Sequence, residues 1–204
     1  MLQIPTATKA LMLSCTAFFC LQFFLPLAAW FGLWPVTSAY FQPWQIVTYA
    51  FLHGDTFHLF FNMLGLYTFG SELERFWGTR RYLQYLAAGV LSAAVTQMLL
   101  SLVMPGMGYT VGISGGIFAL LLAFGMLFPN RTMMLLIPPI PMKARTFAIV
   151  FGVLELVLGL GLLDFILGSS SNVAHFAHLG GMAGGYLMIL YWRGKLPGFG
   201  KRRR

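Results

Sequence analysis

Residues 109–128 read YTVGISGGIFALLLAFGMLF, and this stretch decides the fold because it joins a glycine-flanked serine to a long apolar run. Ser114 stands where the run begins, between Gly112 and Gly115, and Pro129 ends the run. A hydroxyl with such small neighbours is open to approach by another group. Small residues in apolar helices also serve close helix packing, so a catalytic interpretation of Ser114 needs support from the rest of the chain.

The composition predicts a membrane protein. Of 204 residues, 58% are hydrophobic and only 9% are charged, and the mean hydropathy is +0.78. A soluble domain carries about 25% charged residues. Because backbone groups must be hydrogen-bonded internally in lipid, and several apolar segments approach the ~20 residues that cross a bilayer, we predict an all-α polytopic membrane protein.

Six transmembrane segments are predicted, at residues 10–30, 57–70, 82–103, 114–128, 147–167 and 173–192. With six spans, every basic residue falls on one side of the membrane: Lys9, Arg75, Arg80, Arg81, Arg131, Lys143, Arg145, Arg193, Lys195, Lys201, Arg202, Arg203 and Arg204. Basic loops mark the cytoplasmic side. We therefore expect a cytoplasmic N-terminus at 1–9, a membrane domain at 10–192 and a basic cytoplasmic tail at 193–204.

The segments between the spans add three expectations. The basic tail is interpreted as a topology signal or a contact with anionic lipids, and no nucleic-acid partner is expected. The outer segment 31–56 is rich in aromatic residues; it is an interfacial belt or, as we favour, a loop half-sunk in the outer leaflet. The first apolar run is longer than the core of a signal peptide and is expected to remain as a span.

Polar side chains inside spans indicate where function lies. His58 and Asn62 are four residues apart in the second span and share one helix face, Ser114 begins the fourth, and His178 lies in the sixth. Ser114 and His178 each precede the inner boundary by 15 residues and His58 precedes it by 14. At 1.5 Å per residue, all three lie about 21–23 Å above that boundary, and so at one level.

Glycines allow these polar groups to meet. The pairs Gly181/Gly185 and Gly180/Gly184 follow His178 in the sequence AHFAHLGGMAGG, and Gly115 with Ala119 follows Ser114. Such faces let helix backbones approach closely. We therefore predict that His178 lies within hydrogen-bond reach of Ser114 as its general base.

The remaining polar residues receive these interpretations. The side chain of Asn62, the imidazole of His58 and the backbone N–H of Ser114 are candidate donors to an oxyanion. No carboxylate is expected to orient His178, so a dyad is predicted and not a triad. Glu155 is interpreted as a protonated, hydrogen-bonded packing residue, Asp164 as structural, His53 as a hydrogen bonder that anchors the outer loop, and His175 as solvated or bonded to backbone.

A metal site is the main alternative for the four histidines. No carboxylate or thiol apart from Asp55 is expected to join them, and none of the HExxH-type spacings occurs. Cys15 and Cys20 show no metal-ligand spacing. Neither a metal nor a cofactor is therefore expected.

At these residues the chain resembles the rhomboid family of intramembrane serine proteases. The matching motifs run from Trp44 to Gly185. They are the FLH with His53, the HxxxN of His58 and Asn62, the GxxxExxxG of Gly70, Glu74 and Gly78, the GxSG around Ser114, and the AHxxGxxxG from Ala177 to Gly185. One departure is visible: family members often carry Trp-Arg in the first outer loop, where this chain has Trp44-Gln45, and this puts the electrostatic anchoring of the loop in doubt.

The resemblance implies a six-helix rhomboid-like bundle and cofactor-free hydrolysis of peptide bonds in or near the transmembrane segments of other proteins. It assigns Ser114 as nucleophile, His178 as base, and His58 and Asn62 as oxyanion stabilisers, and it places Phe118 beside the histidine. A bacterial inner membrane location is expected, with the site opening to the extracytoplasmic side and residues 168–172 as a candidate gate. A non-catalytic scaffold for transmembrane clients and a histidine-based metal or ion transporter are the rival functions.

Overall fold

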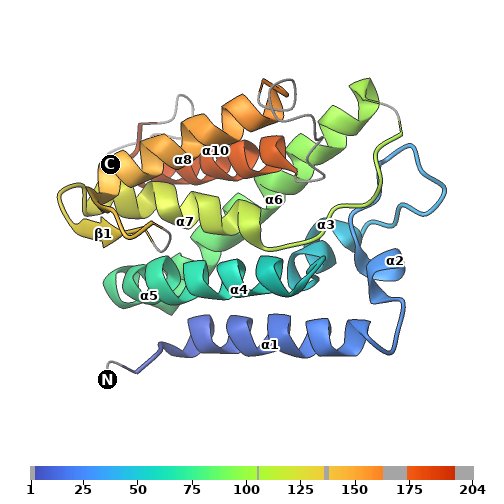
Figure 1. Cartoon of the computed structure of the whole chain (residues 1–204), viewed down its shortest axis with the longest axis horizontal. Coiled ribbons are helices and arrows are strands. Elements are labelled where there is room, and N and C mark those ends of the chain that lie inside the picture. Colours follow the sequence, from blue (N-terminus) through green and yellow to red (C-terminus); the bar gives the residue numbers. More distant parts are fainter. Residues whose placement is uncertain (1–2, 105, 136–137, 163–173, 196–204) are drawn as a thin grey trace, which may run out of the picture.

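The computed structural model describes residues 3–104, 106–135, 138–162 and 174–195. Within these residues, six longer helices form a bundle (Figure 1): α1 (Thr6–Gln22), α4 (Thr56–Gly65), α6 (Thr79–Val103), α7 (Ser114–Leu127), α8 (Ala144–Gly159) and α10 (His175–Trp192). The short helices are α2 (Leu27–Phe31), α3 (Gln45–Thr48) and η1 (Tyr49–Phe51) in the first loop, with η2 (Leu66–Gly70) and α5 (Ser71–Trp77) continuing α4.

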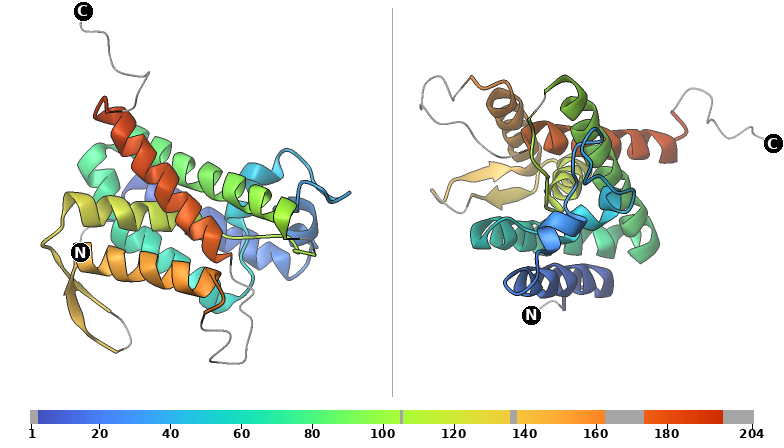
Figure 2. Two further views of the ribbon diagram at one scale, coloured as in Figure 1. Left: turned by 90° about the horizontal axis from the view of Figure 1, so that it is seen from above. Right: turned by 90° about the vertical axis from the view of Figure 1, so that its right-hand side faces the viewer.

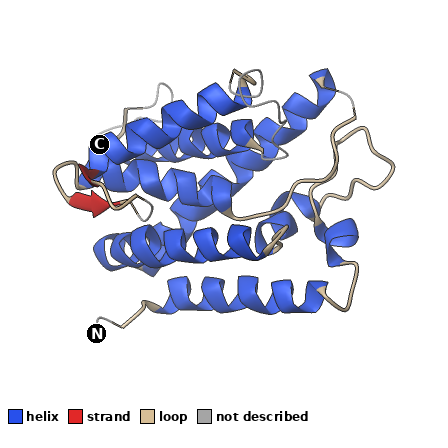
Figure 3. Ribbon diagram, viewed as in Figure 1, coloured by secondary structure: helices blue, strands red, loops and turns tan. Residues whose placement is uncertain are grey.

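Strands occur in one place within the described residues, the connector between α7 and α8 (Figure 3). Strand β1 (Thr132–Met134) pairs antiparallel with β2 (Pro141–Lys143), and Met133 lies opposite Met142. The helix therefore ends before Pro129, as expected, but the connector also forms a small ribbon that the sequence analysis did not predict.

Several helix boundaries differ from those predicted. Helix α1 begins at Thr6 and ends at Gln22, well before residue 30, and Pro26 separates it from α2. The second segment does not end at residue 70 but continues to Trp77 through the π-helical turn η2. Residues 163–167 of the fifth predicted span, Asp164 among them, and the candidate gate at 168–172 lie outside the described residues.

One helix of the described residues, α6, is long and apolar enough to cross a membrane by itself, and α7 is a shorter apolar helix. Helix α7 occupies the centre of the bundle, with nine of its fourteen residues buried, and Figure 2 shows the other helices arranged around it. Its most extensive neighbours are α6 and α10. The hydroxyl of Tyr85 in α6 donates to the carbonyl of Ala119 in α7 at 2.9 Å and so fixes their relative height.

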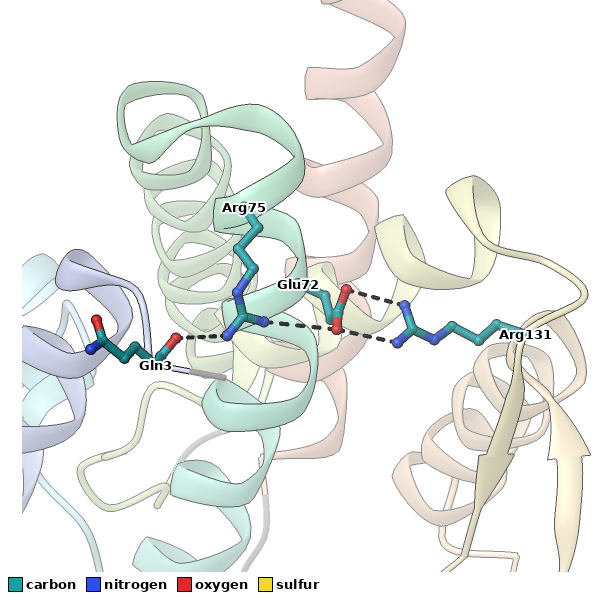
Figure 4. A network of polar contacts seen from close by, with 4 residues as sticks. All are labelled: Gln3, Glu72, Arg75 and Arg131. Atoms are coloured by element: carbon teal, nitrogen blue, oxygen red, sulfur yellow. Dashed lines mark hydrogen bonds and ion pairs between the residues drawn. The ribbon is translucent and has the colours of Figure 1, made fainter. Parts of the chain in front are cut away.

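Exposed ion pairs gather at one end of the bundle (Figure 4). Both guanidinium nitrogens of Arg131 contact the Glu72 carboxylate at 3.1 and 3.2 Å. Arg75 lies 3.8 Å from the same carboxylate and donates to the carbonyl of Gln3 at 2.8 Å. These contacts place the start of α1, the α5 helix and the β1 ribbon together. Exposed ion pairs of this kind contribute little stability. They place basic segments that are far apart in sequence at the same end of the helix bundle.

Gln45 anchors the first loop at the opposite end. Its buried amide oxygen accepts from the backbone N–H of Trp34 and Gln42, at 3.3 and 3.1 Å. Its amide nitrogen donates to the carbonyls of Trp30 and Tyr40, at 3.2 and 3.0 Å. The neutral Gln45 side chain thus binds four backbone groups of the loop. The loop is anchored at this position by hydrogen bonds, without the positive charge of the arginine that family members often carry.

Glu74 joins three segments at the end that carries the ion pairs. Its carboxylate accepts from the backbone N–H of Ala7 and Thr8 at 3.0 and 2.8 Å, and from the hydroxyls of Thr8 and Thr79 at 2.8 Å. These N–H groups belong to the first turn of α1, where helical acceptors are lacking. Gly78, with φ of +77°, supplies the sharp turn that brings Thr79 back to the same carboxylate.

The Glu74 interactions predict a pH dependence of stability. Burial by itself would raise the pKa of Glu74, but the N–H groups of Thr8 and Ala7 and the hydroxyls of Thr79 and Thr8 hold it below its ordinary value of 4.5. A lowered folded-state pKa stabilises the fold above the ordinary value, and this contribution is lost as pH falls through the folded-state pKa.

We therefore expect Glu74→Gln to lower the free energy of unfolding by about 1–3 kcal/mol at pH 7. The difference between wild type and variant should shrink below pH 4.5, as measured by thermal unfolding in detergent across pH. Glu72→Gln, which removes a half-exposed carboxylate nearby, is the control and should show a much smaller difference. A wild type–variant difference that stays constant down to pH 3 would contradict this assignment.

Candidate active site

Ser114 is the first residue of α7, and a glycine two residues earlier makes this start possible. Gly112 has φ of +115°, which side-chain-bearing residues rarely adopt. A Cβ at Gly112 would also lie 2.6 Å from Nε2 of His58. Position 112 must therefore lack a side chain for both reasons. Gly112 lets the start of α7, with Ser114, lie next to the His58 ring.

Close packing of α10 brings His178 to the same place. A Cβ at Gly181 would overlap the carbonyl of Gly115 in α7, and one at Gly185 would lie 2.9 Å from Cβ of Ala119. The other glycine face of α10 packs on α6, where Gly180 meets Thr96 and Gly184 meets Ser92. Both small-residue faces predicted from the sequence are therefore confirmed as helix contacts.

The side chains of Ser114 and His178 are in contact. The Ser114 Oγ lies 2.7 Å from Nε2 of His178, although the two residues are 64 positions apart. The His178 ring stacks on Phe118, one turn along α7, with 4.5 Å between ring centroids and 10° between ring planes. The predicted contact is confirmed, and the stacked ring leaves the imidazole little freedom to rotate.

His58 in α4 lies beside the start of α7, and Asn62 follows it one turn later on the same helix. The Asp55 carboxylate caps this helix by accepting from the His58 N–H at 2.8 Å. The His58 Nδ1 accepts from the Gly54 N–H at 3.4 Å, so the proton of a neutral ring is on Nε2, the nitrogen beside Gly112. Asn62 is 4% exposed, and its side-chain nitrogen has no hydrogen-bond partner among the described residues.

The prediction that no carboxylate orients His178 is wrong. The Glu155 Oε2 in α8 lies 2.8 Å from Nδ1 of His178 and 2.8 Å from Nδ1 of His175. Glu155 is hydrogen-bonded, as expected, but its partners are two histidine rings and it is more than a packing residue. His175 was expected to be solvated or bonded to backbone; it is buried, and its Nδ1 contacts the carboxylate. A carboxylate inside an apolar helix is stable only with partners, and this rule would have made the histidines of the next span candidate partners without establishing the contact.

The three residues also form the one cluster of potential metal ligands found among the described residues, with ligand atoms within 4.8 Å of one another. The expectation that no carboxylate joins the histidines was therefore also wrong. In a tetrahedral zinc site, ligand atoms about 2.0–2.2 Å from the metal lie roughly 3.3 Å from each other. The two 2.8 Å oxygen–nitrogen contacts are shorter than this and match hydrogen bonds.

His53 anchors the outer loop through its backbone. Its N–H and carbonyl pair with the side-chain amide of Gln22 at the end of α1, at 3.1 and 3.0 Å. The ring is fully buried and lies edge-on to that of His58, with 5.1 Å between centroids. Burial lowers the pKa of His53 to about 4, with a smaller contribution from His58, so the ring is neutral at pH 7.

The fold and this cluster define a helical membrane protein with a serine and a histidine in contact between two tightly packed helices. A family model of the Rhomboid domain matches residues 40–195. The chain belongs to the rhomboid family, and the resemblance found in the sequence is confirmed.

Curated relatives agree with this family. Rhomboid protease GlpG of Yersinia pestis is 30% identical over 123 residues, which cover 58% of this chain and 42% of the relative. The protein of the same name from Klebsiella pneumoniae subsp. pneumoniae is 30% identical over 118 residues, covering 56% of this chain and 41% of the relative. The chain thus spans less than half the length of the relatives it matches.

The contact between α7 and α10 predicts an asymmetry between two glycines. In Gly181→Ala the new Cβ would meet the Gly115 backbone, which cannot yield without moving a helix. We expect the free energy of unfolding to fall by about 1–3 kcal/mol, measured as a lower thermal midpoint in detergent. In the control, Gly152→Ala, the Cβ would meet the flexible end of Met182 at 3.2 Å. Equal midpoints for the two variants would contradict the packing argument.

Proposed function

We propose that this protein is an intramembrane serine endopeptidase. The observation that carries the proposal is the 2.7 Å contact between Ser114 Oγ and His178 Nε2, at the start of a helix and beside candidate oxyanion donors. The curated relatives are named proteases, which supports hydrolysis of peptide bonds by this chain. The substrates are other membrane proteins, cut in or near their transmembrane segments, and no cofactor takes part.

The proposal includes the membrane topology predicted from the sequence. Residues 10–192 form a six-span membrane domain, with residues 1–9 and 193–204 in the cytoplasm of a bacterium and the protein in its inner membrane. Support comes from the chain direction, because α1, α4–α5, α6, α7, α8 and α10 alternate between the two ends of the bundle (Figure 1). The Glu72–Arg131 end is then cytoplasmic, and Ser114 opens toward the extracytoplasmic side.

The first chemical step uses the serine as nucleophile and the histidine as base. The Ser114 Oγ attacks the carbon of the scissile carbonyl, and its proton passes to Nε2 of His178. The carbonyl π electrons move to oxygen, and this oxyanion accepts hydrogen bonds from the His58 Nε2–H, the Asn62 side chain and the Ser114 N–H. As the first residue of α7, Ser114 has no intrahelical acceptor for its N–H.

The second half of the reaction returns the enzyme to its starting state. The proton on His178 passes to the amide nitrogen as the carbon–nitrogen bond breaks, which releases an amine and leaves an ester on Ser114. A water molecule then attacks the ester carbon while His178 takes its proton, and the carboxylic acid leaves as the proton returns to Ser114 Oγ. Water reaches the site from the outer face, because the site lies near that end of the helices.

We expect Ser114→Ala and His178→Ala each to lower the cleavage rate of a fluorogenic transmembrane substrate at least about a thousandfold, since each removes a group that reacts. Ser101→Ala is the control. It removes a hydroxyl that donates to the Met98 carbonyl of its own helix, its one partner among the described residues, and this variant should cleave the substrate at the wild-type rate. Cleavage that survives in Ser114→Ala would overturn the proposal.

The rival functions give different results in the same assay. A scaffold would bind the substrate without cutting it, and a metal-dependent function would be lost on adding a chelator. Wild-type cleavage that is unchanged in EDTA and absent in Ser114→Ala supports the protease alone.

The oxyanion donors give a separate prediction. The Asn62 side-chain nitrogen is buried without a partner among the described residues, as expected of a donor held for a transient oxygen anion. We expect Asn62→Ala and His58→Ala to lower kcat by about 10²–10³-fold, with smaller changes in KM. Thr68→Ala, which removes a hydroxyl bonded to its own helix, serves as the control. A large rise in KM with kcat unchanged would assign these residues to substrate binding instead.

A further inference from the structure

A carboxylate on a third helix contacts Nδ1 of His178, the ring nitrogen that does not contact Ser114. Glu155 lies in α8 and is 8% exposed, and its Oε2 contacts Nδ1 of His178 at 2.8 Å. The described acidic residues other than Glu155 lie elsewhere: Asp55 caps α4, and Glu72 and Glu74 lie at the ion-pair end. Glu155 is therefore the carboxylate of the described chain that touches the proposed base.

We propose that Glu155 is a positioning residue for His178: it fixes the tautomer of the proposed base and stabilises the imidazolium that forms when Ser114 is deprotonated, with His175 holding the carboxylate in place. This role rests on the proposed function and extends it, because the sequence led us to expect a serine–histidine dyad without a carboxylate.

The tautomer follows from the hydrogen bonds on one oxygen. A carboxylate only accepts hydrogen bonds, so when Glu155 is ionised both Nδ1 atoms that contact Oε2 must carry their protons. A neutral His178 ring with its proton on Nδ1 has a lone pair on Nε2. That lone pair faces the Ser114 hydroxyl at 2.7 Å. The opposite tautomer would present an N–H to Ser114 and could not accept its proton.

The charge balance during the reaction favours the same role. Proton transfer from Ser114 gives His178 a positive charge in a site where both residues are largely buried. An uncompensated buried charge is strongly destabilising. The groups that face His178 are Phe118 and Ser114 from α7, His175 from its own helix, His58 from α4 and Glu155 from α8. Of these, Glu155 alone carries a negative charge, and it keeps that charge without taking the proton.

Helix packing lets the Glu155 side chain reach the two histidines. Glu155 lies on α8 between two glycines that face α10. A Cβ at Gly152 would meet Met182 at 3.2 Å, and one at Gly159 would meet His175 and Phe176 at about 3.3 Å. Side chains of α10 therefore pack directly on α8 on both sides of Glu155. His175, one turn before His178, supplies the second donor that keeps Oε2 at the meeting point.

Two measurements on purified protein test this role. Steady-state cleavage of a transmembrane substrate gives kcat and KM, and ¹⁵N NMR of the imidazole nitrogens gives the tautomer of each histidine. The chain has four histidines, so single histidine variants assign the signals. The variants are Glu155→Gln, which keeps the shape and removes the charge, and His175→Ala. The matched control, Glu72→Gln, removes a carboxylate at the far end of the bundle.

We expect Glu155→Gln to lower kcat by about 10- to 100-fold, the range that corresponds to losing a hydrogen bond to a charged group, with KM changed less than twofold. The His178 signal should change from the fixed Nδ1–H tautomer to a mixture. His175→Ala should lower kcat less than Glu155→Gln does. Glu72→Gln should leave both kcat and the His178 tautomer as in the wild type.

The outcomes separate this role from the proposed function. If the wild type does not cleave, the endopeptidase and the role of Glu155 are both overturned. If the wild type cleaves and Glu155→Gln has the same kcat, or His178 keeps its tautomer in that variant, only the positioning role is overturned. If Glu155→Gln does not fold, Glu155→Asp, which withdraws the carboxylate by one methylene, is measured against the same two criteria.

Discussion

The close approach of α7 and α10 is the constraint on which the site depends. The carbonyl of Gly115 occupies the space that a Cβ at Gly181 would need, so the two backbones are as near as side-chain-free residues allow. Hydrophobic attraction between helices is absent in lipid, where packing and hydrogen bonds hold a bundle together. The distance between Ser114 and His178 is therefore set by backbone contact one turn away, and flexible side chains have little influence on it.

Much of this arrangement could be predicted from the sequence because it follows from helix periodicity and depth. Nearly equal offsets from the predicted inner boundary placed Ser114, His178 and His58 at one level, and the glycine pairs identified which faces meet. Glu155 was missed for a physical reason. Helix α8 begins at Ala144, 11 residues before Glu155, whereas α10 ends at Trp192, 14 residues after His178. This difference of three residues is about 4.5 Å, which a glutamate side chain can span, but only the rotation of α8 about its axis decides whether it points that way.

Other contacts could not be predicted because they join a side chain to the backbone of a distant segment. Gln45 binds four backbone groups of the first loop, and nothing in its local sequence indicates the shape of that loop. Glu74 was recognised only as part of a motif, and its contacts with the start of α1 explain that motif. Glycine allows the turn at residue 78, and the carboxylate caps a helix whose N–H groups have no other acceptor. Gln45 and Glu74 therefore hold loops and helix ends in place at the two ends of the bundle, while glycine faces determine how closely the helices pack in its middle.

The position of Glu155 also explains why a buried carboxylate is tolerated so close to the proposed site. Each ionisable group inside an apolar bundle is costly unless its partners are also inside. One oxygen that accepts from two imidazoles satisfies three buried polar groups at once, and the Ser114 hydroxyl satisfies the remaining nitrogen of His178. In contrast, the Asn62 side-chain nitrogen has no partner among the described residues. The proposed base is thus hydrogen-bonded on both ring nitrogens, whereas the proposed oxyanion donor Asn62 has no acceptor among the described residues. This difference is the one that stabilisation of negative charge on a substrate oxygen, as proposed, would require.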